Sequence, residues 1–374
     1  MTRRLTRRTL LKTGLAAAAP ALLPLHAAAQ ERRFEPQPGP WRGFELTTSV
    51  SVPEAKGATR IWLPLPDVAT DYQRSIDNAW TGNATASRIV SDPARGVRML
   101  YAEFPASVGT PTLTLTSRVE TRSRAVDWSR SGAVNALVKE DPALLRAHLA
   151  PSELLPVDGL VRKTALEATR GKTTDVDKTR ALYDWVIANA HREPKTRGCG
   201  VGDIKTMLET GDLSGKCADL NALFVGMCRS VGIPARDVYG VRVAPSAFGY
   251  RELGANSANL KGAQHCRAEV FLRQHGWVAM DPADVLKVMR QETPVWIKDR
   301  NHALVAPVAK GLFGNWEGNW VAWNTAHDVM LPGTTVKGSL PFLMYPQGEN
   351  DGGRFDELAP DNFRYTIAAR ELTA

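Results

Sequence analysis

The stretch GKCADLNALF, residues 215–224, predicts a cysteine at the N-terminal end of a buried helix. Apolar residues recur at the spacing of a helix with one face in a core, namely Leu220, Leu223, Phe224, Met227, Cys228 and Val231. Gly232 ends this helix and Pro234 prevents it from continuing. On the first turn, the thiol of Cys217 lies near the positive end of the helix dipole and near free N–H groups, which lower its pKa. That position suits a nucleophile, although a lone cysteine is more often an inert core residue.

A second stretch, QHCRAEVFLRQHGWVAMDP at residues 264–282, predicts two strands joined by a turn. If the turn centres on Arg273, His265 lies directly across from Asp281 on the same face. Considered singly, each residue has a simpler structural explanation. His265 could be a hydrogen-bonded histidine without a catalytic role, and Asp281 could cap the end of its strand. Together with Cys217 they supply a nucleophile, a base and an acid that orients the base, so we favour a Cys-His-Asp triad.

Four short motifs together resemble the transglutaminase-like superfamily, whose core is a papain-like cysteine fold. They are Gly215-x-Cys217-x-Asp219, residues 232–236, His265 followed by Glu269-Val270, and Gly276-Trp277 leading to Asp281-Pro282. The resemblance covers about residues 175–285. It implies an α+β catalytic core and thioester chemistry on peptide amide bonds, with hydrolysis or acyl transfer as the outcome. Because the superfamily includes members that have lost activity, a catalytically silent binding or scaffold protein is the alternative.

Two residues bear on how this resemblance applies. The family's chemistry implies two oxyanion donors, the backbone N–H of Cys217 and a side chain upstream, for which His191 is the candidate. Ala218 follows the nucleophile, where the animal crosslinking enzymes of the superfamily carry Trp. This departure favours hydrolysis or an unusual transfer over tissue-type crosslinking. We expect Glu269 to be structural, because Asp281 already provides the carboxylate partner.

Residues 1–29 have the pattern of a secretory signal peptide. Basic residues precede an apolar run, and Ala27-Ala28-Ala29 offers a small-residue cleavage site. Residues 6–12, TRRTLLK, resemble the twin-arginine export signal. We therefore expect a periplasmic protein without a membrane segment after cleavage; an uncleaved anchor is the alternative.

Charge and cysteine content exclude several classes of protein. Without the five basic residues of the leader, the chain has 42 basic and 39 acidic residues, and the two signs are interspersed, so no nucleic-acid partner is expected. The four cysteines form no C-x-x-C pair, and we expect no metal and no cofactor. A periplasmic setting permits a disulfide between Cys199 and either Cys266 or Cys228. The expected partner is a peptide or protein substrate, and the location suggests a cell-wall peptide; the oligomeric state stays open.

Composition shifts divide the mature chain into four parts. Residues 41–124 predict an N-terminal β-sandwich-like domain, 125–174 a helical connector, 175–290 the catalytic core, and 291–374 a C-terminal extension that packs on the core. Within the extension, Trp316, Trp320 and Trp323 could line the floor of a substrate groove. Aromatic residues at such spacing are more often core residues.

Overall fold

The computed structural model describes residues 32–130, 137–361 and 363–373. The signal peptide expected at residues 1–29 lies outside the described residues. In the described ranges no helix is both long enough and apolar enough to cross a bilayer. The mixture of helices and strands confirms the predicted α+β class.

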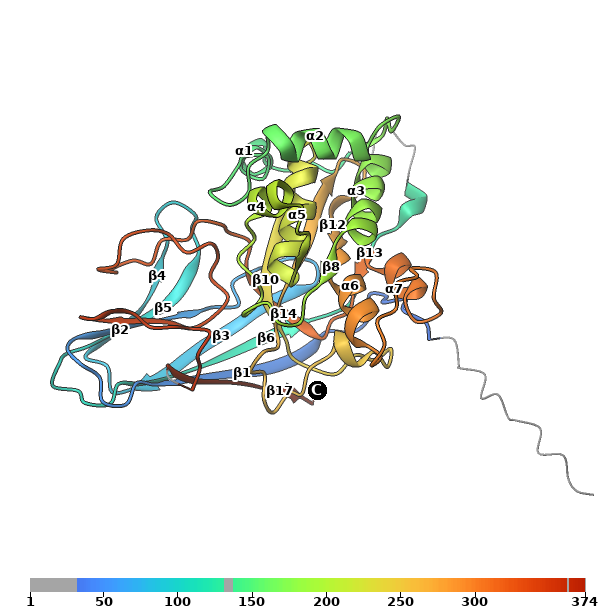
Figure 1. The fold of residues 1–374 in the computed structure, drawn as a ribbon. Helices are drawn as coiled ribbons and strands as arrows, with labels where there is room; N and C mark the ends of the chain where they lie inside the picture. The colour runs from blue at the N-terminus through green and yellow to red at the C-terminus, as the bar shows by residue number, and fades with distance from the viewer. Residues whose placement is uncertain (1–31, 131–136, 362, 374) are drawn as a thin grey trace, which may run out of the picture. The chain divides into compact units, whose positions relative to one another are not determined.

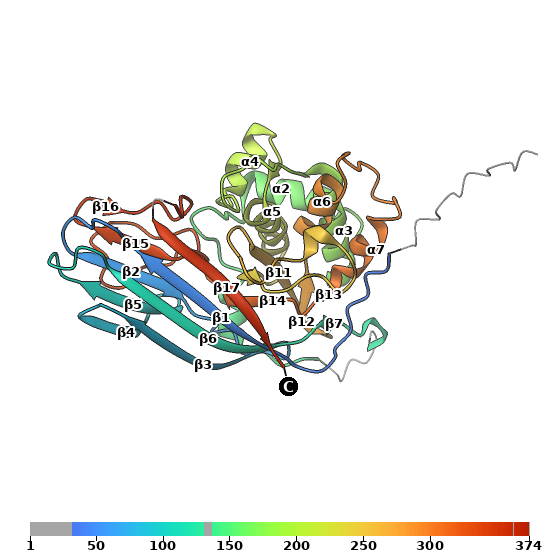
Figure 2. The same ribbon diagram turned by 90° about the horizontal axis from the view of Figure 1, so that it is seen from below.

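Two antiparallel sheets form a sandwich in the N-terminal part of the chain (Figures 1 and 2). The first has the order β17-β1-β6-β3 and contains β1 (Arg42–Ser51), β3 (Gln73–Gly82), β6 (Thr112–Thr121) and β17 (Arg364–Leu372). The second has the order β16-β15-β2-β5-β4 and contains β2 (Thr59–Pro64), β4 (Ala86–Ser91), β5 (Arg98–Phe104), β15 (Gln347–Asn350) and β16 (Gly353–Arg354). Phe44 and Leu46 of β1 share one apolar core with Ile61 and Leu63 of β2. These contacts hold the two sheets face to face.

The sequence did not predict β3 and β4. Both lie at sheet edges, β3 beside β6 and β4 beside β5. Most residues of β3 are exposed, so the strand lacks the apolar alternation by which a strand is recognised. A polar edge strand also protects a sheet from pairing with another chain.

The C-terminal region is shared among the sheets. Strand β17 pairs with β1 along its length, and β15 pairs with β2, so both complete the N-terminal sandwich. Strands β13 (Phe313–Trp316) and β14 (Trp320–Asn324) join the central sheet instead. The prediction of an extension over residues 291–374 that packs on the catalytic core is therefore incomplete, because pairing between distant strands leaves no local sequence signal.

The central antiparallel sheet has the order β14-β10-β11-β12-β13-β7. Its remaining strands are β7 (Arg124–Ala125), β10 (Ala235–Arg242), β11 (Gln264–Leu272) and β12 (Gly276–Met280). The helices are η1 (Trp128–Arg130), α1 (Pro142–Ala147), α2 (Gly159–Ala168), α3 (Asp175–Asn189), α4 (Ile204–Thr210), α5 (Cys217–Ser230), η2 (Arg251–Leu253), α6 (Pro282–Gln291) and α7 (Ala306–Gly311). A small parallel pair, β8 (His191–Arg192) and β9 (Ser214–Gly215), lies before α5.

Helix α5 is buried on every side. The spacing predicted a single buried face, but α5 packs on β10 and β11 and is enclosed by α2, α3, α4 and α6 (Figure 1). Its polar side chains therefore need partners inside the protein. Arg229, for example, donates hydrogen bonds to the carbonyl oxygens of Ala150 (3.0 Å) and Ala235 (2.8 Å).

The three tryptophans after β12 are core residues. Trp316, Trp320 and Trp323 are all buried. The indole N–H of Trp316 donates to the carbonyl of Met280 (3.2 Å), and that of Trp320 donates to the carbonyl of His265 (2.9 Å). Trp316 and Trp320 are therefore structural, and Trp320 supports the backbone at His265. Trp323 also lines a hollow, which is separate from the cavity at Cys217.

Glu269 is buried between two arginines. Its carboxylate accepts from Arg236 Nε at 2.7 Å and from the guanidinium of Arg124, which ties β11 to β10 and β7. Both guanidinium groups hold the pKa of Glu269 below its ordinary value against the opposite effect of burial.

We predict that Glu269→Gln lowers the free energy of unfolding by about 3–5 kcal/mol, because it leaves buried guanidinium charge uncompensated. Urea unfolding of the leader-free protein measures this change. Glu209→Gln is the matched control, since Glu209 forms only an exposed pair with Lys205 on α4 and should change stability by less than about 1 kcal/mol. Equal stabilities of the two variants would contradict the structural role of Glu269.

Candidate active site

Cys217 is the first residue of α5 and is 2% exposed. The carboxylate of Asp219 fixes this end of the helix by accepting from the backbone N–H groups of Lys216 (2.9 Å) and of residues 201–202 (3.0 Å). Gly200 has φ +87°, and a Cβ there would lie 1.8 Å from an Asp219 carboxylate oxygen. Glycine is therefore required at this position, and the loop and the helix start are held as one unit.

Backbone N–H groups surround the thiol at the helix start. The N–H of Ala218 donates to the carbonyl of Cys199 (2.9 Å), which fixes the chain on one side of Cys217. The N–H of Cys217 lies in the first turn, where a helix provides no acceptor. It is thus available to a group that enters the site.

His265 and Asp281 are in direct contact. Nε2 of His265 lies 2.8 Å from Oδ2 of Asp281, and both side chains are buried. The hairpin turn centres on Gln274, one residue later than expected, because Gly276 adopts a left-handed conformation (φ +73°). A shift of one residue at the centre moves each cross-strand partner by two, so the two side chains still share a face.

The carboxylate at 281 also begins the next helix. Asp281 is the N-cap of α6 and accepts from the backbone N–H of Asp284 (3.0 Å). The second carboxylate, that of Asp284, lies 3.4 Å from Nε2 of His265 and is paired with Arg242 of β10. Sequence reasoning missed both Asp284 and Arg242; a second Asp in the first turn of a helix that follows Asp281 was the available signal.

Charges around His265 set its protonation. Burial alone lowers the pKa of His265, and Arg242 lowers it further, but Asp284 and Asp281 outweigh both and raise the pKa to about 9. At Asp284, Arg242 more than reverses the effect of burial and holds the carboxyl pKa well below its usual range. The imidazole is consequently protonated at neutral pH, with Nε2 directed at Asp281 and Nδ1 left for another partner.

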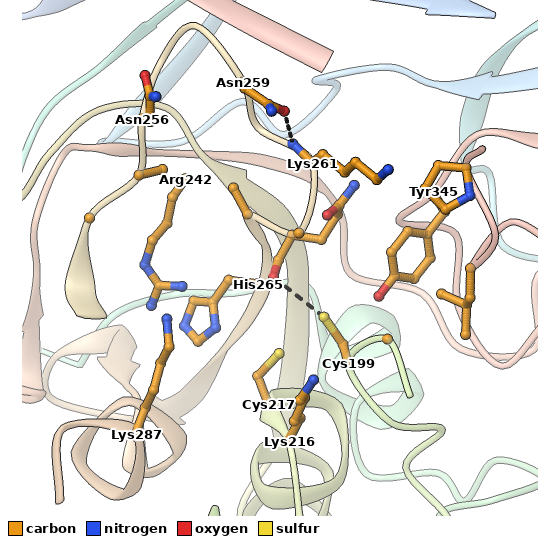
Figure 3. Close-up of a pocket in the computed structure, with 18 of the residues that line it drawn as sticks. Cys199, Lys216, Cys217, Arg242, Asn256, Asn259, Lys261, His265, Lys287 and Tyr345 are labelled. Atoms are coloured by element: carbon orange, nitrogen blue, oxygen red, sulfur yellow. Dashed lines mark hydrogen bonds between the residues drawn. The ribbon is translucent and has the colours of Figure 1, made fainter. Parts of the chain in front are cut away.

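The thiols of Cys199 and Cys266 and the imidazole of His265 act on the thiol of Cys217. Hydrogen bonding with the two thiols lowers its pKa well below the ordinary value, against burial, and His265 lowers it further. All four cysteines are free, so the structure contains no Cys199–Cys266 disulfide. Figure 3 shows Cys217, Cys199 and His265 around one cavity. The arrangement favours a thiolate paired with an imidazolium.

Asn221 connects the helix to the other two groups. Its Nδ2 donates to the carbonyl of Cys266 (2.9 Å) and to Asp281 (3.2 Å), while its Oδ1 accepts from the N–H of Ala283 (3.2 Å). Asn221 is four residues after Cys217 on α5, so helical periodicity alone could have indicated that it faces the site.

His191 does not reach this cavity. Its ring lies 5.5 Å from that of Trp296, tilted by 34°, and lines a separate hollow beside α3 and α6. The neighbouring residue, Arg192, lines both this hollow and the cavity of Cys217. His191 is therefore not placed to donate to a group bound at Cys217.

The cavity at Cys217 has a volume of about 480 Å³. Basic side chains and Gln264 make up much of its polar lining. Gln264 is 6% exposed, and its Nε2 has no hydrogen-bond partner among the described residues. This buried amide donor is therefore available to a ligand or to an ordered water.

His265, Asp281 and Asp284 lie close enough together to bind a metal ion, their ligand atoms being within 4.8 Å of one another. Both oxygens of Asp284 already accept from Arg242. The guanidinium of Arg242 therefore supplies the positive charge that a metal ion would otherwise bring. His265, Asp281 and Asp284 fit an ion-pair network better than a metal site.

Comparison with known proteins identifies one family and one full-length relative. A model of the transglutaminase-like superfamily matches residues 162–282, which contain Cys217, His265 and Asp281. An uncharacterized protein of Haemophilus influenzae is 31% identical over 341 residues, which cover 88% of this chain and 91% of that protein.

Solved structures show more distant likeness. A chain from Cytophaga hutchinsonii, provisionally described as a cysteine protease, has 15% identity and a TM-score of 0.48, over 89% of this chain and 99% of that one. The periplasmic domain of TgpA from Pseudomonas aeruginosa has 17% identity and a TM-score of 0.36, over 71% of this chain and 76% of that one.

We predict that iodoacetamide alkylates Cys217 at a rate that is nearly constant between pH 6 and 8, because the thiolate is present above its lowered pKa. Peptide mapping by mass spectrometry identifies the modified cysteine. Asp281→Asn should lower the pKa of His265, weaken the ion pair and make the rate rise with pH. Asp175→Asn, an exposed change on α3, should keep the flat profile. A wild-type rate that rises with a midpoint near the ordinary thiol pKa of about 8.5 would contradict this assignment.

Proposed function

The chain belongs to the transglutaminase-like superfamily, and on that premise we propose that it is a cysteine-dependent enzyme that cleaves or transfers peptide amide bonds through a thioester. One observation carries the proposal. A cysteine on the first turn of a buried helix lies beside an imidazole that is hydrogen-bonded through Nε2 to a buried carboxylate (Figure 3). Cys217, His265 and Asp281 then act as nucleophile, acid-base and orienting acid.

In the first half-reaction, the thiolate sulfur of Cys217 attacks the carbonyl carbon of the amide, and the π electrons move onto the carbonyl oxygen. Collapse of this tetrahedral intermediate breaks the C–N bond, and the leaving nitrogen takes the proton of His265. The products are a thioester, a free amine and a neutral imidazole.

In the second half-reaction, His265 takes a proton from water or from another amine, which attacks the thioester carbon. Loss of the sulfur restores the thiolate and the imidazolium, and releases a carboxylic acid or a new amide. Ala218, where the animal crosslinking enzymes carry Trp, favours hydrolysis or an unusual transfer over tissue-type crosslinking.

Two donors are available for the oxyanion of the intermediate. The N–H of Cys217 has no acceptor within its helix, and Gln264, whose buried Nε2 has no partner among the described residues, is one of the residues that line the same cavity. We assign the second donor to Gln264 in place of His191. Its burial makes the hydrogen bond stronger than the same bond in water.

The leader supports a periplasmic location. Residues 6–12 carry the twin arginines and residues 27–29 the small-residue cleavage site. Because peptides of the cell wall are present in that compartment, we propose them as the natural substrates.

The function is tested by incubating the leader-free protein with a defined mixture of glutamine-containing peptides, with and without a primary amine. We predict new carboxyl or amine-substituted products and a peptide thioester at Cys217, detected by mass spectrometry. Cys217→Ala and His265→Ala should abolish both. Cys228→Ala, the same kind of change eleven residues later on α5, should abolish neither, because Cys228 lies deep in the core. Reactive Cys217 without any product or thioester would favour the binding or scaffold alternative.

We predict that Gln264→Met lowers kcat by about 10²- to 10³-fold, because the variant keeps the shape of the side chain but lacks the donor. Its alkylation by iodoacetamide should stay close to that of the wild type, since this reaction forms no oxyanion. Gln274→Met in the hairpin turn is the matched control and should retain full kcat. Equal losses in alkylation and in kcat would indicate a structural role for Gln264 and remove it from the proposed oxyanion site.

A further inference from the structure

The cavity at Cys217 is lined by an unusual number of basic side chains. They are Arg192, Lys216, Arg242, Lys261 and Lys287, and no acidic residue is among the described residues that line it. Figure 3 shows Lys216 beside Cys217, and Lys287 beside Arg242 on the side of His265. Positive charge therefore surrounds the thiol from several elements of the fold.

Three of these cations have carboxylate partners. Arg242 pairs with Asp284, Lys287 lies 3.4 Å from Glu252, and Lys261 lies 2.8 Å from Asp361. These pairs are locally neutral, so they contribute little to a preference for charge in a ligand.

Arg192 and Lys216 differ from the other three. Neither is within ion-pair distance of a carboxylate in the ranges that the structure describes. Arg192 is held by one hydrogen bond from Nε to Oε1 of Gln291 (2.8 Å), which leaves its terminal nitrogens for another acceptor. Burial, and then the charge of Arg192, lower the pKa of Lys216, so the two cations act on each other. Two neighbouring cations without a direct carboxylate partner form a site that an anion stabilises.

We propose that Arg192 and Lys216 bind a carboxylate of the substrate, so that the cavity selects acidic peptides whose scissile amide reaches Cys217. This inference rests on the proposed function and names the substrate class of the same site. A carboxylate matches the free edge of the Arg192 guanidinium. The unpartnered amide of Gln264 adds a buried donor suited to a peptide carbonyl. Tyr345, Leu358 and Pro360 supply apolar lining for the rest of a peptide.

The test compares two alkylating reagents that differ in charge. Iodoacetate carries a carboxylate and iodoacetamide does not, and both modify the same sulfur by the same displacement of iodide. The ratio of their rate constants at Cys217, measured at pH 7.5 by mass spectrometry, reports the preference of the cavity for an anion. Iodoacetamide also corrects each variant for any change in thiolate reactivity.

We predict that Arg192→Gln and Lys216→Gln each lower the iodoacetate to iodoacetamide ratio about three- to tenfold, and that added salt lowers the wild-type ratio. Arg192→Lys keeps the charge and should keep most of the ratio. Lys205→Gln, an exposed change on α4, is the matched control and should leave it unaltered.

The outcomes separate the two proposals. A Cys217 that reacts with neither reagent would overturn the proposed function and this inference with it. A reactive Cys217 whose ratio is the same in Arg192→Gln, Lys216→Gln and wild type would overturn the inference alone. Protection of Cys217 by inorganic phosphate at concentrations where glutarate gives none would assign the cations to a phosphate ligand and overturn the carboxylate proposal.

Discussion

A protonated imidazole persists inside this protein because two carboxylates are buried with it. Asp281 and Asp284 both lie within 3.4 Å of Nε2 of His265. An imidazolium and two carboxylates carry one net negative charge, which Arg242 compensates by pairing with Asp284. Arg267, which lies 3.8 Å from Asp281, adds a further positive charge. Removing any member leaves a buried charge unpaired, so the cluster fixes how α6, β10 and β11 fit together.

The same cluster determines where the thiol must be. Asn221 joins α5 to Asp281 and to the backbone of β11, so the helix cannot slide along the sheet without breaking a buried hydrogen bond. Asp219 holds the other side, where it fastens the helix start to the loop at residues 200–202. Cys217 is on the first turn of the helix that these two side chains anchor. The position of this sulfur is thus a consequence of how the core is assembled.

The placement of Cys217, His265 and Asp281 was more predictable from the sequence than that of the residues around them. Helix starts and hairpins are encoded locally, so the sequence indicated Cys217 on a first turn and His265 beside Asp281 even though the predicted turn centre was one residue early. Arg242 and Asp284 meet only in the folded sheet, and nothing within either segment signals that contact. The pairing of β17 with β1 was missed for the same reason. The choice of His191 as oxyanion donor failed because β8 was not predicted as a strand, so the direction of its side chains was unknown. The ring of His191 lies in another hollow and not in the cavity at Cys217.

Charge in the cavity links binding to reactivity. The cations that attract a carboxylate also stabilise the thiolate, and a stabilised thiolate is a weaker nucleophile, with a Brønsted coefficient of about 0.4–0.5. If a substrate carboxylate neutralises Arg192 and Lys216 as proposed, the thiolate of Cys217 loses the stabilisation that these two cations provide. The buried pair with His265 remains, because Asp281 and Asp284 are shielded from the ligand. The sulfur then stays ionised while becoming more nucleophilic, so an acidic peptide would activate the group that attacks it, whereas a neutral peptide in the same cavity would meet the less reactive form.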